Sequence, residues 1–125
     1  MGLSSGAHGI LRAYNRLARE KRMSARGYVH FMPNVMDEML ELGTWNMPVS
    51  DYLYYGGVKS FADGSIQSLT AVLGEPYACK PDLCGDHVLT PEQIAELIAK
   101  YHCQRVPVAF HPNGHAHVYF AVRGL

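Results

Sequence analysis

Residues 57–65 read GVKSFADGS, and this stretch decides how the chain is interpreted. Val58 and Phe61 flank Lys59 in a segment typical of a buried strand, and Asp63-Gly64 leads into a turn. Burying a bare ammonium group is costly. The side chain of Lys59 must therefore be paired, neutralised, chemically modified or directed into an open cavity.

Spacing alone leaves four explanations of Lys59 open. In the first, it forms an ion pair with Asp63 or extends its ammonium group to solvent from the strand end. In the second it is a neutral amine that forms a Schiff base, and in the third it binds a phosphate or carboxylate. In the fourth, its side-chain nitrogen is carboxylated and becomes an anion that bridges two divalent metals, with His111 as a neutral nitrogen ligand.

Apolar periodicity and capping signals predict three helices. An amphipathic helix is expected over residues 7–22, and a second one is expected to begin at an Asn34 cap and end at Gly43. The third is the clearest, because Thr90, Pro91 and Gln93 supply an N-cap, a first-turn proline and a capping box.

Short apolar segments between these helices predict strands over residues 26–32, 58–61 and 106–111. Helices and strands alternate, which is typical of βα units and of a parallel sheet. Residues 63–88 form an unusually long connection without sustained periodicity, and such loops are commonly functional. Lys59 and His111 lie in or at the end of predicted strands, where α/β proteins place their sites.

The composition and net charge of the chain limit the classes of binding partner that we expect. The 125 residues are 48% hydrophobic and 18% charged, with eleven basic and eleven acidic side chains, so one globular domain without a net charge is expected. We therefore expect no nucleic-acid partner and no membrane partner, and a cytoplasmic location is the default. Three cysteines are too few for a disulfide scaffold and are expected to be free thiols.

Other histidines and cysteines give weaker signals. His115 and His117 follow His111 closely, but they match no helical zinc motif and are more typical of solvated or hydrogen-bonded histidines. A structural zinc site formed by cysteines and one histidine is an alternative with looser spacing than usual; its members are Cys79, Cys84, His87 and Cys103.

Taken together, several segments resemble the amidohydrolase superfamily, and within it the branch of N-substituted formamide deformylases. They are residues 57–65, Thr70-Ala71, Glu75-Pro76-Tyr77, Gly85 before the capped helix, and Val108-Ala109-Phe110-His111 with Gly114. The resemblance runs over about residues 7–116 of a single domain, 1–125, whereas residues 117–125 diverge from the family's next helix.

This resemblance implies a (β/α)₈ barrel of which the chain supplies roughly three parallel strands with flanking helices. It implies that Lys59 occupies the fourth-strand metal position, commonly a carboxylated lysine, and that His111 is the fifth-strand ligand of one or two divalent metals, expected to be zinc. The loop after the lysine is then expected to line the substrate opening, with Asp63, Ser65 and His115 as candidates to contact a small amide substrate.

The chain also departs from the family pattern. A barrel needs about 250 residues, and the family takes further ligands from a first-strand His-x-His, a sixth-strand histidine and an eighth-strand aspartate that handles protons. This sequence has no region for those groups. We therefore expect a central fragment of a metal-dependent hydrolase, inactive alone. The alternative is a non-catalytic, truncated α/β module that oligomerises through its open sheet edges.

Overall fold

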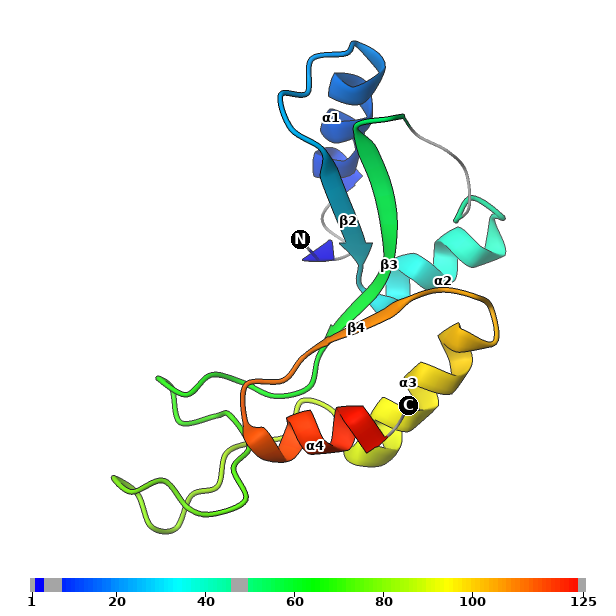
Figure 1. The fold of residues 1–125 in the computed structure, drawn as a ribbon. Helices are drawn as coiled ribbons and strands as arrows, with labels where there is room; N and C mark the ends of the chain where they lie inside the picture. The colour runs from blue at the N-terminus through cyan, green and yellow to red at the C-terminus, as the bar shows by residue number, and fades with distance from the viewer. Residues whose placement is uncertain (1, 4–7, 46–49, 124–125) are drawn as a thin grey trace. The chain divides into compact units, whose positions relative to one another are not determined.

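The computed structural model describes residues 2–3, 8–45 and 50–123, and the chain divides into two compact units, Met1–Lys59 and Ser60–Leu125. Each unit is an α/β assembly (Figure 1). In chain order the elements are β1 (Gly2–Leu3), α1 (His8–Arg19), β2 (Gly27–Phe31), α2 (Pro33–Glu41), β3 (Leu53–Phe61), α3 (Pro91–His102), β4 (Val108–His111) and α4 (His115–Arg123).

The first unit is built on parallel strands. β1 pairs with β2 through His30 and Phe31, and β2 pairs with β3 from Gly27 opposite Leu53 to Phe31 opposite Val58. The three parallel strands with flanking helices fit part of a (β/α)₈ barrel, as predicted. β3 continues into the second unit, where β4 is its neighbour in the strand order.

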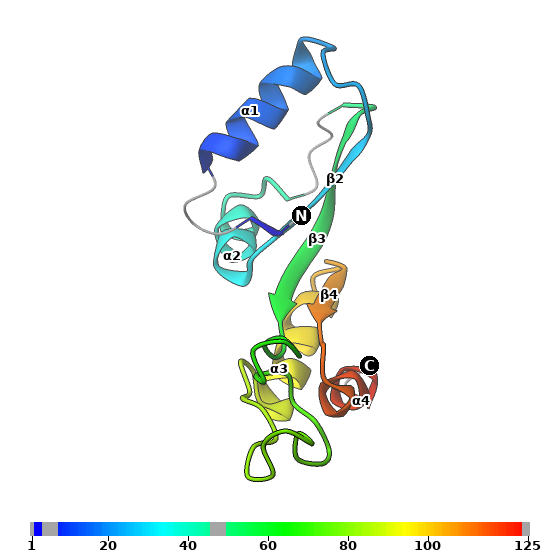
Figure 2. The same cartoon turned by 90° about the vertical axis from the view of Figure 1, so that its left-hand side faces the viewer.

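One face of β2 and β3 is covered by helices α1 and α2, which lie on the same side of these strands (Figure 2). Buried side chains fill this layer: from the strands Val29, Phe31, Leu53 and Val58, and from the helices Ala18, Val35, Met36 and Met39. The other face exposes aromatic residues. Tyr28 and Tyr54 stack with ring centroids 5.7 Å apart and are 64% and 40% exposed.

Helix α2 begins two residues earlier than the predicted Asn34 cap would place it. Met32 is the N-cap and has no side-chain capping bond, and Pro33 opens the helix, so the prediction that Asn34 caps it is wrong. The proline fixes a helical φ at a position whose N–H needs no intrahelical partner. The predicted end is confirmed: Gly43 has φ +65°, and Thr44 donates its N–H to the carbonyl of Met39, as in a Schellman motif.

The second unit packs α3 and α4 with β4. Its core contains Ala62, Ile94 and Ile98, with Leu89, Val108 and Phe110 against them. The predicted capping box of α3 is confirmed, because Thr90 Oγ1 accepts the N–H of Gln93 at 3.3 Å and the Gln93 side chain accepts the N–H of Thr90 at 2.9 Å.

The predicted strands also occur, with shifted bounds: Leu53–Phe61 extends the predicted 58–61 strand toward the N-terminus. Helix α1 occupies His8–Arg19 of the predicted 7–22, of which Ala7 lies outside the described residues. Helix α4 was not predicted. Among the described residues, none of the helices has the length and apolar character needed to cross a membrane.

Candidate functional site

Lys59 lies near the carboxyl end of β3, as predicted, and is half-buried there. Burial lowers the pKa of its amine below the usual lysine value. A lowered pKa enlarges the fraction of neutral amine at neutral pH, and the neutral amine is the form that reacts as a nucleophile.

His30 is a neighbour of Lys59 that sequence reasoning did not connect with it. It lies on β2 opposite Gly57, two residues before Lys59, at a point where the strand pairing shifts register. Burial, with a contribution from the positive charge of Lys59, lowers the pKa of His30. His30 therefore favours the neutral imidazole, the form that accepts hydrogen bonds and binds metals.

Gly56 and Gly57 allow the side chains of Tyr28 and His30 to lie over β3 on the exposed sheet face. A Cβ on Gly56 would lie 2.4 Å from the Tyr28 ring and 2.8 Å from the His30 ring, so both rings occupy space that a side chain would need. Gly57 has φ +133°, which L side chains rarely adopt. A register shift of this kind cannot be predicted from strand periodicity, although a Gly-Gly pair within a strand is a signal for one.

His111 is the last residue of β4, and its side chain is exposed. Its imidazole meets the ring of Phe61 edge-on, with centroids 5.6 Å apart. The imidazole is therefore accessible to a ligand at the strand end, where the sequence placed it. Lys59 belongs to the first unit and His111 to the second, so a shared site for the two side chains stays a prediction.

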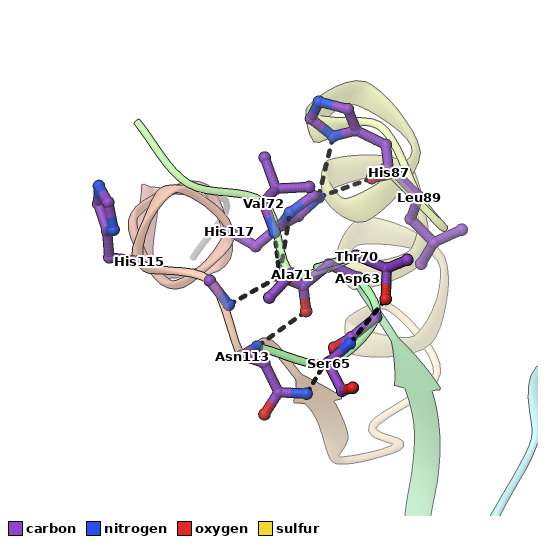
Figure 3. Close-up of polar contacts among 12 residues, drawn as sticks. Asp63, Ser65, Thr70, Ala71, Val72, His87, Leu89, Asn113, His115 and His117 are labelled. Carbon is purple, nitrogen blue, oxygen red and sulfur yellow. Dashed lines mark hydrogen bonds and ion pairs between the residues drawn. The ribbon is translucent and has the colours of Figure 1, made fainter. Parts of the chain in front are cut away.

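Asp63 is the centre of the polar contacts in the second unit (Figure 3). Asp63 is 2% exposed, and its carboxylate accepts three backbone N–H groups: Val72 at 2.9 Å, Asn113 at 2.8 Å and Gly114 at 2.7 Å. His117 Nδ1 lies 3.7 Å from Asp63 Oδ2. Asp63 thereby fixes the turn that follows His111 to the start of the long loop.

The electrostatics of Asp63 follow from these contacts. Burial alone acts to raise the pKa of the carboxyl group, but the three N–H donors and His117 outweigh it, so the pKa of Asp63 lies below its usual value. Asp63 is therefore an anion at neutral pH. The expectation that it contacts substrate stays a prediction, and its observed contacts are with the chain itself.

The backbone of the long loop also lies in close contact with itself and with the turn after His111. A Cβ on Gly114 would lie 1.9 Å from the carbonyl oxygen of Val72, and one on Gly85, which has φ +95°, would lie 2.1 Å from that of Ala71. Tyr77 donates its hydroxyl to the same Ala71 carbonyl at 2.8 Å. The 63–88 segment is thus an internally bonded loop.

The remaining substrate-loop candidates sit on this loop and at the start of α4. Ser65 is half-buried, its N–H bonds to Thr70 Oγ1 at 3.0 Å, and its hydroxyl lies 2.8 Å from that of Ser68. His115 is exposed, and its Nε2 accepts the N–H of Gly74 at 3.0 Å. Whether these side chains meet a substrate stays a prediction.

His87 and His117 are the pair that sequence reasoning missed. His117 is fully buried, and its Nε2 lies 3.2 Å from His87 Nδ1 and 2.9 Å from the carbonyl oxygen of Leu89. Three histidines that are close in sequence thus have different environments in the structure: His111, His115 and His117. Their spacing along the chain carries no signal that His117 lies close to Asp63 and His87.

The alternative of a cysteine-containing zinc site finds no support. Cys79, Cys84 and Cys103 are exposed free thiols, as the cysteine count predicted. Within residues 2–3, 8–45 and 50–123, no group of three or more His, Cys, Asp or Glu side chains is placed to hold a metal ion.

Comparison with known proteins identifies the family. The model of the amidohydrolase family matches residues 4–125, nearly the whole chain. The chain belongs to the amidohydrolase family. The match reaches further toward both ends than the 7–116 range covered by the motifs quoted above, and it includes α4.

Two curated relatives support this membership. The chain is 33% identical over 95 residues to protein LONG AFTER FAR-RED 3 of Arabidopsis thaliana and 30% identical over 104 residues to the putative amidohydrolase YtcJ of Bacillus subtilis. These matches cover 75% and 83% of this chain but only 16% and 19% of the relatives. The chain therefore corresponds to less than one fifth of the length of either relative.

Solved structures give the same picture. An uncharacterized metal-dependent hydrolase from Pyrococcus furiosus matches with a TM-score of 0.85 and 31% identity, over 98% of this chain and 26% of the other. A second one, from Pyrococcus horikoshii OT3, matches with a TM-score of 0.82 and 30% identity, over 91% and 23%. The fold of this chain is thus that of a portion of a larger hydrolase.

Proposed function

We propose that this chain forms the central part of a metal-dependent hydrolase that cleaves non-peptide carbon–nitrogen bonds of small amides or formamides. The observation that carries the proposal is the family match over residues 4–125, together with a lysine near the end of β3 whose pKa is lowered by burial. Three free cysteines agree with a cytoplasmic location, which belongs to the same proposal.

In this proposal Lys59 and His111 hold a divalent metal, with zinc as the expected ion. The residue types fit this task, because an accessible imidazole and an anionic oxygen are both ligands that zinc accepts. When bound, the metal supplies Lewis-acid polarisation of the substrate carbonyl and a water that deprotonates near neutral pH.

Carboxylation would turn Lys59 into such an anionic ligand. The neutral amine attacks carbon dioxide, a nitrogen–carbon bond forms, and one proton leaves the nitrogen to solvent, so that the ammonium charge is replaced by a carboxylate. The lowered pKa of Lys59 favours the neutral amine that this reaction needs.

His111 presents its imidazole at the end of β4, next to the turn that Asp63 holds. Because Asp63 bonds the N–H groups of Asn113 and Gly114, the backbone after His111 has a fixed path. A fixed backbone limits the positions of the imidazole, and such preorganisation improves ligand binding.

Carboxylation can be measured directly. Nuclear magnetic resonance of the chain with ¹³C-bicarbonate and zinc is expected to show a carbamate carbon that is lost in Lys59→Ala and kept in Lys80→Ala, an exposed lysine of the long loop. A carbamate signal that persists in Lys59→Ala would contradict the assignment of this residue.

Hydrolysis is expected to be absent in the isolated chain, because the family's other ligands and its proton-handling aspartate have no counterpart in it. The chain should be incubated with zinc or manganese and bicarbonate, and release of amine from formamides and N-acyl amino acids compared with blank. A rate above blank that disappears in Lys59→Ala would overturn the proposed inactivity.

An exposed aromatic face favours association between copies of the chain, as the second candidate requires; that candidate is a non-catalytic module that oligomerises, with its open sheet edges as the predicted contact. Tyr28 and Tyr54 stack on the face of the sheet opposite helices α1 and α2, and both are exposed. Sedimentation equilibrium of the wild type and of Tyr28→Lys separates the candidates. A dimer that is insensitive to chelators and is lost in the variant would support the module.

A further inference from the structure

His117 combines complete burial with polar neighbours on both ring nitrogens. It lies in the first turn of α4, and its ring is close to Asp63 and His87, at the two ends of the long loop (Figure 3). The ring of Phe120, from the same helix, meets it edge-on with centroids 5.9 Å apart. Neither the proposed metal site nor the substrate candidates involve this ring. Its protonation state can be argued from the contacts of each nitrogen.

The Nε2 atom faces a carbonyl oxygen. Leu89 O lies 2.9 Å away, which is a hydrogen-bond distance, and a carbonyl oxygen accepts but never donates. Nε2 must therefore carry a proton for this contact to be favourable. His87 Nδ1, at 3.2 Å, can then share that proton as a second acceptor.

The Nδ1 atom faces a carboxylate. Asp63 Oδ2 lies 3.7 Å away, and both side chains are fully removed from solvent. Within the described part of the chain, Nδ1 of His117 is a buried polar atom without a hydrogen-bond partner. Asp63 is an anion, since it accepts three backbone N–H groups.

Each neutral form of the ring places an acceptor against an acceptor. With the proton on Nε2 alone, the lone pair of Nδ1 faces the Asp63 carboxylate. With the proton on Nδ1 alone, the lone pair of Nε2 faces the carbonyl of Leu89 at 2.9 Å. A ring with both nitrogens protonated donates to the carbonyl of Leu89 and places a positive charge 3.7 Å from the buried negative charge of Asp63, which it offsets.

We propose that His117 is a buried imidazolium ion paired with Asp63, and that this charge makes the attachment of α4 to the long loop sensitive to pH. The pair joins residues 63 and 117, while Leu89 and His87 hold the same ring from the other end of the loop. Loss of the proton would leave Asp63 without its counter-charge.

Other titratable groups near His117 lie on the long loop, on α3 and on α4. From the loop end, His87 faces Nε2 and must be unprotonated at Nδ1 to accept a hydrogen bond there; its own side chain is exposed. Glu92, in the first turn of α3, is a carboxylate close to His87. From α4 the neighbour is the uncharged ring of Phe120, and His115 instead bonds Gly74.

The sign of the pH effect follows from proton counting. An unfolded histidine loses its proton near pH 6.5, whereas the proposed ion pair requires that the folded protein carries this proton. Where the unfolded histidine is neutral and the ion pair is intact, the folded state binds one more proton than the unfolded state. Stability therefore falls as the pH rises, by about tenfold in the folding equilibrium constant per pH unit.

Nitrogen-15 spectra of the histidine rings test the protonation state without any substitution. At pH 7.5 the ring of His117 is expected to show a proton on both nitrogens, and the signals are assigned by their absence in His117→Gln. A single protonated nitrogen at this pH would overturn the proposal. Should His117→Gln fail to fold, scalar and through-space correlations within the wild-type spectrum provide the assignment.

Urea unfolding between pH 6.5 and 9 tests the linkage. The folding equilibrium constant of the wild type and of His102→Gln, an exposed histidine at the end of α3, is expected to fall with rising pH as described. His117→Gln is expected to lose this dependence. An equal pH dependence in all three proteins, or a flat profile in the wild type, would contradict the buried charge.

Discussion

Asp63 shows how a single buried charge organises a segment of irregular structure. The carboxylate takes three backbone N–H groups from two distant parts of the chain, and each of those groups would otherwise be a donor without a partner. The residue thus ties the start of the long loop to Val72 within that loop and to the turn that follows His111.

Replacing Asp63 with asparagine tests this role. The amide keeps the shape but turns one acceptor oxygen into a donor that faces a backbone N–H, so we expect Asp63→Asn to lower the free energy of unfolding by about 2–4 kcal/mol. Urea unfolding followed by circular dichroism measures this loss. Asp86→Asn, an exposed position of the same loop, is the matched control and should change stability little.

The loss of stability caused by Asp63→Asn should become smaller at low pH. The pKa of Asp63 is lowered in the folded protein, so its stabilising contribution is present above the unfolded value of about 4 and is lost as the pH falls through the folded value. The stability difference between wild type and Asp63→Asn should therefore shrink in acid. A difference that stays constant down to pH 2 would contradict the role of the charge.

Local signals predicted those elements whose stabilising groups are close in sequence. Two such signals were recognised in the sequence: the capping box of Thr90 and Gln93, and the helix end at Gly43. In both, the hydrogen-bonded groups lie within five residues of each other. The prediction that Asn34 caps α2 was wrong, because the helix begins at Pro33. Local sequence signals therefore predicted whether an element is a helix or a strand more reliably than they predicted its first residue.

Helix α4 was missed for a physical reason. Residues 115–123 read HAHVYFAVR, in which β-branched and aromatic residues favour a strand over a helix. Gly114 allows the helix to form, because its buried backbone approaches Val72 closely and its carbonyl accepts the N–H groups of His117 and Val118. Tertiary packing here decides against local propensity.

The capping box of α3 provides a quantitative prediction. Thr90→Ala removes the acceptor for the N–H of Gln93 and should lower the free energy of unfolding by about 1 kcal/mol. Thr90→Ser keeps the hydroxyl and should recover most of this loss. Thermal or urea unfolding of the two variants compares them, and equal losses in both would rule out the hydroxyl as the stabilising group.

A pair of glycine-to-alanine substitutions separates crowded from open positions. Gly114→Ala places a Cβ against the backbone of Val72, so we expect the protein to be strongly destabilised, by several kcal/mol. Gly9→Ala, in α1, meets no atom within 4 Å and should stabilise the helix by about 0.5 kcal/mol. Melting temperatures report both effects. A stable Gly114→Ala protein would contradict the close approach.

For the molecule as a whole, the sequence predicted the family, the α/β class and the parallel strands. It could not predict the Asp63 contacts, because their partners lie 9 to 51 residues away and carry no motif. The predicted positions were correct, with Lys59 inside β3 and His111 at the end of β4, whereas a common site for them belongs to the proposed function.

The net charge of the whole chain predicts the pH at which the protein is least soluble. With eleven acidic and eleven basic side chains, the protein carries no formal charge near neutral pH, so its solubility should pass through a minimum near pH 7.0. Turbidity and light scattering across pH 5–9 measure this minimum. Arg12→Glu, on an exposed face of α1, lowers the net charge by two and should move the minimum to lower pH. An unmoved minimum would show that apolar contacts govern association.

The contact of Asp63 with Gly114 closes a stretch of 51 residues. Closing so long a stretch costs entropy before any stabilisation is gained, and contacts of this kind slow folding. On the ribosome, Asp63 emerges well before the residue that completes its shell of donors. The bond to Val72 spans only nine residues and can form first, whereas the anchoring of the long loop is completed only after Asn113 and Gly114 have been synthesised.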